Sequence, residues 1–222
     1  VGSEMCIRDR YRKFEETHTN PDRLVASLFK DKYFILKKVN PKELMWGMYW
    51  VASDMQNAET KVSFYDLFKG QELFDLWQCV NYRFYVGNAN HADGKGIVVA
   101  NAKSLLRNIL DSADEAIRKG GIAATLRFGH DGNVIPLVAL MQIENCNVAV
   151  SDPYEVYKVW SDFKVVPMAA NVQIIFFRNE KSNDILVKIM HNENEVHIPV
   201  QTDMFPYYRW RDVENYYRGM LK

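Results

Sequence analysis

A histidine and an aspartate stand side by side in the stretch "TLRFGHDGNVIPL", residues 125–137. An apolar run precedes Gly129, the pair His130–Asp131 follows it, and an apolar helical pattern comes next. A histidine can donate a hydrogen bond to a phosphate oxygen, and a carboxylic acid can supply the proton that a leaving alcohol needs. The pair is therefore the first candidate for an active site.

The elements around this pair predict where it would lie. The run 122–128, "IAATLRF", is typical of a short apolar strand, and 133–143, "NVIPLVALMQI", is typical of a helix. The turn that joins this strand to this helix, and that carries His130 and Asp131, would lie at the carboxyl end of the strand. Open α/β sheets bind ligands at that edge. The unpaired N–H groups and the positive end of the following helix also suit phosphate.

Asp131 has a simpler alternative role, as the cap of the following helix. If Asp131 were the cap, Pro136 would be the fifth helical residue, and its missing N–H would break an intrahelical bond. If Asn133 is the cap, Pro136 is the third helical residue and no bond is lost. We therefore predict Asn133 as the cap, which leaves Asp131 freer for another role.

Three further residues are candidate substrate contacts: Arg127, His91 and Asn133. Arg127 precedes the pair and could line an anion site, with a strand residue in a surface ion pair as an equal alternative. His91 lies in the polar loop 88–96, "NANHADGKG", where a solvated histidine is the simpler interpretation.

Bulk properties exclude several classes of protein. The 222 residues are 48% hydrophobic and 25% charged, which is typical of globular proteins with one large or two small domains. The 28 basic and 28 acidic residues balance, so the net charge does not favour binding to nucleic acid or to an anionic membrane. No apolar run is long enough to span a bilayer. Cys6, Cys79 and Cys146 lack metal-ligand spacing, and no P-loop or dinucleotide fingerprint occurs.

The remaining pattern predicts helices first and an α/β layer second. We predict helices over 20–29, 40–56, 70–88, 98–121, 153–160 and 210–221, and strands over 171–178, 184–191 and 194–200, with a turn at 179–183. The alternation in the second half predicts an α/β layer. We therefore divide the chain into a mainly helical segment, 11–94, and an α/β segment, 95–222.

The first ten residues, "VGSEMCIRDR", look foreign to the rest of the chain. They resemble the translated read-through of a sequencing adapter, and we predict that they are non-native. Their pattern continues into no helix or strand of the residues after them. On this interpretation the chain is a fragment whose native amino-terminal part is missing.

The segment "LRFGHDGNVIPLVALM", 126–141, resembles the C-terminal signature of the histidine acid phosphatases, and most of all the multiple inositol polyphosphate phosphatases, which include phytases. Further segments resemble this family in the same order. They are "LWQCVNYRFYVGN", similar to the helix before the active-site loop, "VVPMAANVQIIFFR" and "VKIMHNENEVHIPV", similar to the last core strands, and "PYYRWRDVENYY", similar to the closing segment. The resemblance covers most of residues 11–222.

The resemblance implies a phosphomonoester hydrolase that works in two steps. In this family a histidine of an RHGxRxP-type motif attacks phosphorus and becomes phosphorylated, and the arginines of that motif hold the phosphate. His130 matches a second phosphate-binding histidine, and Asp131 matches the acid that protonates the leaving oxygen. The implied fold is the C-terminal half of a histidine phosphatase α/β core with part of a helical cap domain. No metal or organic cofactor is implied.

Two departures from the family pattern limit what is implied. The chain contains no RHGxRxP motif, so we expect the nucleophile upstream and expect the 222 residues alone to be inactive. Inositol polyphosphate phosphatases often carry histidine-alanine-glutamate at this site, whereas His130–Asp131 matches bacterial phytases and acid phosphatases.

The implied partner is a small-molecule phosphomonoester, with inositol polyphosphate (phytate) as the first choice. The implied location is periplasmic or secreted. The alternative, from another functional class, is a non-catalytic module that binds an anion in the same pocket. An RHGxRxP motif in the upstream reading frame would favour the enzyme.

Overall fold

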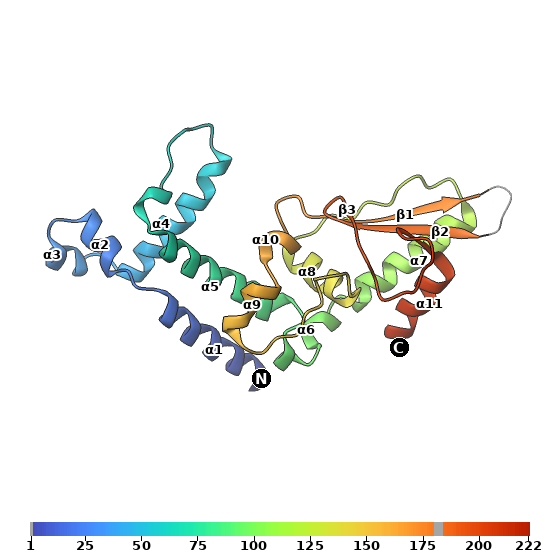
Figure 1. The fold of residues 1–222 in the computed structure, drawn as a ribbon, viewed down its shortest axis with the longest axis horizontal. Coiled ribbons are helices and arrows are strands. Elements are labelled where there is room, and N and C mark those ends of the chain that lie inside the picture. Colours follow the sequence, from blue (N-terminus) through green and yellow to red (C-terminus); the bar gives the residue numbers. More distant parts are fainter. Residues whose placement is uncertain (1, 180–183) are drawn as a thin grey trace. The chain divides into compact units, whose positions relative to one another are not determined.

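The structure is a computed structural model that describes residues 2–179 and 184–222. The chain divides into two compact units, Val1–Arg83 and Phe84–Lys222. Helices and one antiparallel sheet make up the described part (Figure 1), so the predicted α/β class is confirmed. No helix in this part is both long and apolar enough to cross a membrane.

The first unit is helical throughout, and it begins with a helix that we did not expect. Its elements are α1 (Gly2–His18), α2 (Asp22–Leu28), α3 (Lys32–Leu36), α4 (Pro41–Asp54), the short 3₁₀ helices η1 (Met55–Asn57) and η2 (Tyr65–Leu67), and most of α5 (Gly70–Asn88). The expectation that the pattern of residues 1–10 stops before residue 11 is wrong, because α1 is continuous from Gly2 to His18. Several of these residues are good helix formers, which lets the helix extend through them.

Capping explains why α4 begins where the sequence predicted. The Asn40 side chain accepts hydrogen bonds from the backbone N–H groups of Lys42 and Glu43, at 3.0 and 3.3 Å. Pro41 occupies the first helical position, where its missing N–H costs nothing. The predicted helices over 20–29, 40–56 and 70–88 are thus confirmed as α2, α4 and α5.

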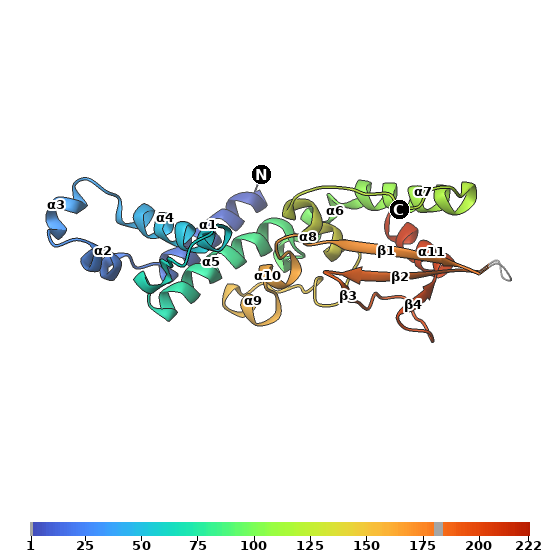
Figure 2. The same ribbon diagram turned by 90° about the horizontal axis from the view of Figure 1, so that it is seen from above.

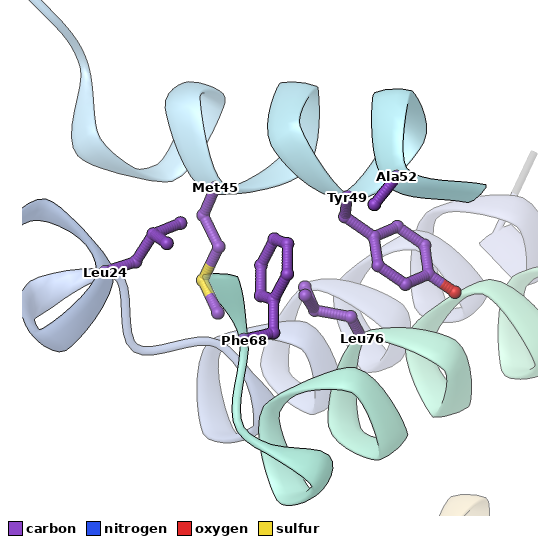
Figure 3. Packing of buried hydrophobic residues seen from close by; sticks show 6 residues of the cluster. All are labelled: Leu24, Met45, Tyr49, Ala52, Phe68 and Leu76. Carbon is purple, nitrogen blue, oxygen red and sulfur yellow. The ribbon is translucent and has the colours of Figure 1, made fainter. Parts of the chain in front are cut away.

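Apolar side chains from α2, α4, α5 and the residue that follows η2 form the core of the first unit (Figure 3). The six buried members are Leu24, Met45, Tyr49, Ala52, Phe68 and Leu76.

An ion pair between Arg23 and Glu72, which we call the charged clamp, joins two elements of this unit. The Arg23 guanidinium donates to both carboxylate oxygens of Glu72, each at 2.5 Å. Arg23 also donates to the Leu67 carbonyl at 2.8 Å. The clamp therefore fixes α2 to the start of α5.

The second unit contains the sheet. Its elements are the end of α5, η3 (Ala92–Gly94), α6 (Ile97–Ala100), α7 (Lys103–Lys119), α8 (Asp131–Leu140), α9 (Pro153–Val159), α10 (Asp162–Val165), β1 (Val172–Arg178), β2 (Ile185–His191), β3 (Asn194–Glu195), β4 (Tyr207–Arg209) and α11 (Trp210–Met220). All pairs are antiparallel: β2 pairs with β1, β3 and β4. Within the described residues β1 pairs with β2 alone, so it is an edge strand.

Most predicted elements of this unit are confirmed, with boundaries that differ. The predicted helix over 98–121 is two helices, because the N–H groups of Asn101 and Ala102 bond to carbonyls three residues back and end α6. The predicted third strand, 194–200, shrinks to the two residues of β3. The predicted turn at 179–183 lies largely outside the described residues.

The predicted strand over 122–128 is wrong. Residues 120–130 have no regular structure, and every one of them is exposed. A strand is stable only when its backbone groups bond to a neighbouring strand. The residues that the structure describes supply no such neighbour to this segment.

Helix α11 closes the second unit by binding α7 and α8. The Trp210 indole N–H donates to Asp114 at 3.1 Å, and Arg218 bonds to Asp111, Asp114 and Glu214. The buried Tyr217 hydroxyl donates to the Met141 carbonyl at 2.9 Å, just after α8 ends. Polar bonds from one face of α11 therefore fix α7 and the end of α8.

A buried thiol and imidazole meet at the end of β2. The Cys146 sulfur lies 3.7 Å from Nδ1 of His191, and Nε2 of His191 lies 2.8 Å from the Val165 carbonyl oxygen. A carbonyl can only accept, so Nε2 carries the proton and Nδ1 is the acceptor that faces the thiol. Burial lowers the pKa of His191 and raises the pKa of Cys146 to about 12. Both groups are therefore neutral at pH 7.

This pair predicts an acid-sensitive fold. The pKa of His191 is 6.5 in the unfolded chain and lower in the folded one, so stability is full above pH 6.5 and falls as the unfolded chain takes up the proton. His191 should contribute a loss of up to about 1.4 kcal/mol per pH unit below 6.5, until the folded pKa is passed. Urea unfolding between pH 5 and 7.5 measures this slope.

The substitution His191→Gln should flatten the slope, because glutamine can still donate to Val165 but does not titrate. The matched control is His197→Gln, at an exposed histidine, and it should leave the slope unchanged. An unaltered slope in His191→Gln would show that other groups cause the acid sensitivity.

Candidate functional site

His130 and Asp131 lie together where α8 begins. His130 is the extended N-cap residue, with φ −104° and ψ 170°, and Asp131 is the first helical residue. Both are exposed. One carboxylate oxygen of Asp131 accepts a hydrogen bond from the Gly132 N–H at 2.7 Å. The structure therefore brings the two predicted residues to one accessible turn, at the positive end of a helix.

The prediction that Asn133 caps this helix is wrong. The cap is His130, three residues earlier, and Asn133 binds back to it. The Asn133 side-chain oxygen accepts from the His130 N–H at 3.3 Å, while the Asn133 N–H donates to the His130 carbonyl at 2.8 Å. This back-bonding stabilises the early start, so the helix tolerates Pro136 in its interior. Asn133 thus positions His130 through its backbone.

Two glycines of this turn, Gly129 and Gly132, lie next to asparagine side chains. A Cβ atom on Gly129 would lie 3.3 Å from the Asn133 side-chain oxygen, so a larger residue would press on the group that binds His130. A Cβ atom on Gly132 would lie 3.6 Å from the Asn88 side-chain oxygen. Asn88, the last residue of α5, therefore lies beside the first turn of α8. We did not predict this neighbour, because residues 44 positions apart show no spacing signal.

Arg127 is tethered to α7, and the surface ion pair considered for it is not what the structure shows. Its Nε and Nη2 atoms donate to the Asn108 side-chain oxygen at 3.1 and 2.8 Å, and Nη2 also donates to the Ser112 hydroxyl at 2.7 Å. These partners are neutral. Arg127 therefore holds the segment before His130 against α7.

His91 is buried, with 2% of its surface exposed, so the expectation of a solvated histidine is wrong. The ring packs edge-on against Tyr85 at a centroid distance of 5.8 Å. Its loop is held by Asn90, which donates to the Asn147 side-chain oxygen at 2.7 Å. Polar composition suggested an open loop, but these contacts draw the loop into the unit. His91 therefore packs inside the unit and is not exposed alongside His130 and Asp131.

The arrangement supplies a hydrogen-bond donor that can bind an anion, and a carboxyl group that can act as an acid. An exposed imidazole and a carboxyl group stand on adjacent residues, beside the first N–H groups of α8. Such a turn can bind a phosphate and protonate a leaving oxygen. In the part of the chain described, no cluster of three histidine, cysteine or acidic residues could hold a metal ion.

Comparison with known proteins places this chain in a family. The model described as histidine phosphatase superfamily (branch 2) matches residues 11–192. No match was found among curated proteins.

The fold resembles crystal structures of the multiple inositol polyphosphate phosphatase of Bifidobacterium longum. The apo form has a TM-score of 0.64 at 23% identity, covering 78% of this chain and 38% of that chain. The complex with inositol hexasulfate has a TM-score of 0.66 at 23% identity, covering 80% and 39%. The complex with phosphate has a TM-score of 0.66 at 23% identity, covering 82% and 40%. The chain therefore spans about two fifths of the length of these structures.

The tether of Arg127 predicts a change in protease sensitivity. Asn108→Ala removes the main acceptor of the guanidinium but leaves the sequence of 122–128 intact. Chymotrypsin should then cleave after the exposed Phe128 several-fold faster, because the segment is released from α7. The matched control is Ser104→Ala, at an exposed position on the same helix. Equal cleavage rates in Asn108→Ala and the unchanged chain would contradict the tether.

Proposed function

The chain belongs to branch 2 of the histidine phosphatase superfamily, and on this premise we propose that the protein is a phosphomonoester hydrolase of the histidine acid phosphatase type. The observation that carries the proposal is the exposed pair His130–Asp131 at the first turn of α8. Inositol polyphosphates, with phytate as the first choice, are the proposed substrates. Support for this class comes from the resemblance to the Bifidobacterium longum enzyme, whose complexes hold inositol hexasulfate and phosphate. A periplasmic or secreted location belongs to the same proposal.

The proposed reaction proceeds through a phosphohistidine. A histidine of an RHGxRxP-type motif, supplied by a segment that precedes these 222 residues, attacks phosphorus as the bond to the leaving oxygen breaks. His130 donates a hydrogen bond to a phosphate oxygen, and Asp131 gives its proton to the leaving oxygen. Water then attacks the phosphohistidine and releases inorganic phosphate.

The hydrogen bond at Asp131 occupies only one of its two carboxyl oxygens. The Gly132 N–H holds Oδ1 of the carboxyl group, which leaves Oδ2 to carry the proton. A phosphate dianion bound beside the carboxyl group favours its protonated form by like-charge repulsion. Substrate binding would therefore prepare the acid for the step in which it acts.

Replacing Asp131 should slow the hydrolysis of esters with poor leaving groups far more than the hydrolysis of esters with good leaving groups. In the protein extended by its upstream reading frame, Asp131→Asn should lower turnover of inositol phosphates by about 10²- to 10⁴-fold, because the alkoxide then leaves without a proton. Turnover of 4-nitrophenyl phosphate should change little, because this leaving group needs less protonation. Steady-state kinetics on both substrates measures the difference.

The control for this variant is Asp152→Asn, at an exposed aspartate that caps α9. Asparagine caps as well as aspartate, so both activities should persist. Equal losses on the two substrates in Asp131→Asn would remove Asp131 from the acid role.

Replacing the histidine should weaken phosphate binding. In the same extended protein, His130→Ala should raise the inhibition constant of inorganic phosphate at least about 10-fold, because a hydrogen bond to a charged group is lost. His197→Ala, at an exposed histidine, is the matched control. An unchanged inhibition constant in His130→Ala would show that His130 does not bind phosphate.

The upstream reading frame discriminates between an enzyme and a binding module. An RHGxRxP motif in that frame supports the hydrolase. A complete gene that lacks the motif supports a module that binds an anion at His130 without turnover.

A further inference from the structure

Helix α3 and the residues beside it form a small surface where exposed apolar side chains adjoin lysines. The stretch is "KDKYFILKK", residues 30–38, which we call the α3 tip. Tyr33 is 84% exposed, Phe34 58% and Leu36 43%. None of these three belongs to the six buried residues that form the core of the first unit. Packing within that core therefore does not account for the apolar residues of the tip.

The local bonds of α3 turn these residues to solvent. Asp31 caps the helix, because its carboxylate accepts a hydrogen bond from the Phe34 N–H at 2.9 Å. Residues three apart share a face of a helix, as Tyr33 and Leu36 do, whereas Ile35 points away from Tyr33 and is half-buried. Figures 1 and 2 show α3 at one end of the first unit, joined to the rest of it through α2 and α4.

Positive charge is concentrated in the same stretch. Residues 30–38 contain four lysines and one aspartate, so their net charge is 4 − 1 = +3, whereas the whole chain is neutral. Lys30, Lys37 and Lys38 are exposed, and within the described part of the chain no acidic side chain forms an ion pair with them. Lys37 follows Tyr33 by four residues, which puts both on the same side of the helix. The balance of the whole chain therefore conceals a local cationic surface.

This combination of side chains fits the surface of an anionic membrane. Aromatic and leucine side chains enter the boundary between headgroups and acyl chains, while lysines stay at the level of the headgroups. A tyrosine suits this boundary, because its ring is apolar and its hydroxyl group can stay hydrated. The five residues of α3 are far too few to span a bilayer. A protein partner fits less well, since lysine is depleted from protein–protein interfaces.

We propose that the α3 tip binds an anionic lipid surface, with its apolar side chains inserted between headgroups and its lysines against their negative charges. One short apolar cluster with a net charge of +3 gives a weak and reversible attachment. Each lysine near such a surface should change the affinity by roughly 5-fold. The inference goes beyond the proposed function, and it does not depend on phosphatase activity.

The first test is co-sedimentation with vesicles, of phosphatidylcholine alone or of equal parts of phosphatidylcholine and phosphatidylserine. The 222-residue chain and the longer protein encoded with its upstream reading frame should both bind the anionic vesicles. Their affinity for the neutral vesicles should be at least about 10-fold lower, because the lysines then lack a partner. Raising the salt concentration to about 0.5 M should release both proteins from the anionic vesicles, because salt screens exposed charges.

The second test reverses charge at the tip. In both proteins Lys37→Glu with Lys38→Glu should weaken binding to the anionic vesicles at least about 25-fold, since two lysines each contribute roughly 5-fold. The matched control is Lys13→Glu with Lys61→Glu, at two exposed lysines of the first unit. This control changes the net charge equally, so it separates the tip from the overall charge. It should weaken binding no more than about 2-fold.

The third test removes the aromatic side chains. Tyr33→Ser with Phe34→Ser should weaken binding at least about 10-fold, because the apolar area that enters the boundary is lost. The thermal midpoint should move by less than about 2 °C, because substitutions at exposed positions cost little stability. Phe128→Ser, at a phenylalanine 92% exposed in the second unit, is the matched control and should leave binding unchanged.

Four outcomes would overturn the proposal. They are equal binding to neutral and anionic vesicles, undiminished binding in either tip variant, binding by the chain that the longer protein lacks, and a dimer that forms through the tip without vesicle binding. The third would show that other polypeptide covers the tip, and the fourth would assign the tip to a second copy. A longer protein that binds anionic vesicles through the tip but has no phosphatase activity would uphold the membrane surface and reject the proposed function.

Discussion

The backbone of an apolar strand must hydrogen-bond to a neighbour, and the second unit of this protein depends on that requirement. Residues 122–128 carry the side chains of a strand, yet no described segment pairs with them. Arg127 binds the segment to α7, and Leu126 and Phe128 are exposed to water. The candidate site begins where this segment ends, so the contacts that hold the segment also affect the position of the site.

The turn that carries His130 and Asp131 is nevertheless built from short-range bonds. Asn133 binds the backbone of His130, Gly132 binds the Asp131 carboxylate, and Arg127 ties the preceding segment to α7. Helix α7 is in turn bound by α11 through arginine and tryptophan contacts. Local geometry at the site therefore rests on contacts within the second unit, while the residues of the segment that leads to it are exposed.

The sequence predicted the parts of this fold that local chemistry decides. Asn40 and Pro41 marked the start of α4, and alternating apolar runs marked β1 and β2, because caps and periodicity act within a few residues. The strand at 122–128 failed because strand identity depends on neighbours that the pattern of one segment does not reveal. The prediction of an Asn133 cap is wrong because Asn133 binds back to the His130 N–H, which stabilises a helix that begins earlier and contains Pro136. His91 is buried in a loop that the neighbouring Asn90 binds to Asn147, a residue far away in the sequence, and polar composition conceals such a bond.

In the proposed reaction, the start of α8 supplies the donor to phosphate and the acid, and another part of the polypeptide supplies the nucleophile. A donor to phosphate and an acid for the leaving group can be held by one helix start, because both act at the edge of the reacting phosphoryl group. The nucleophile must approach phosphorus opposite the leaving oxygen, so it has to come from another element.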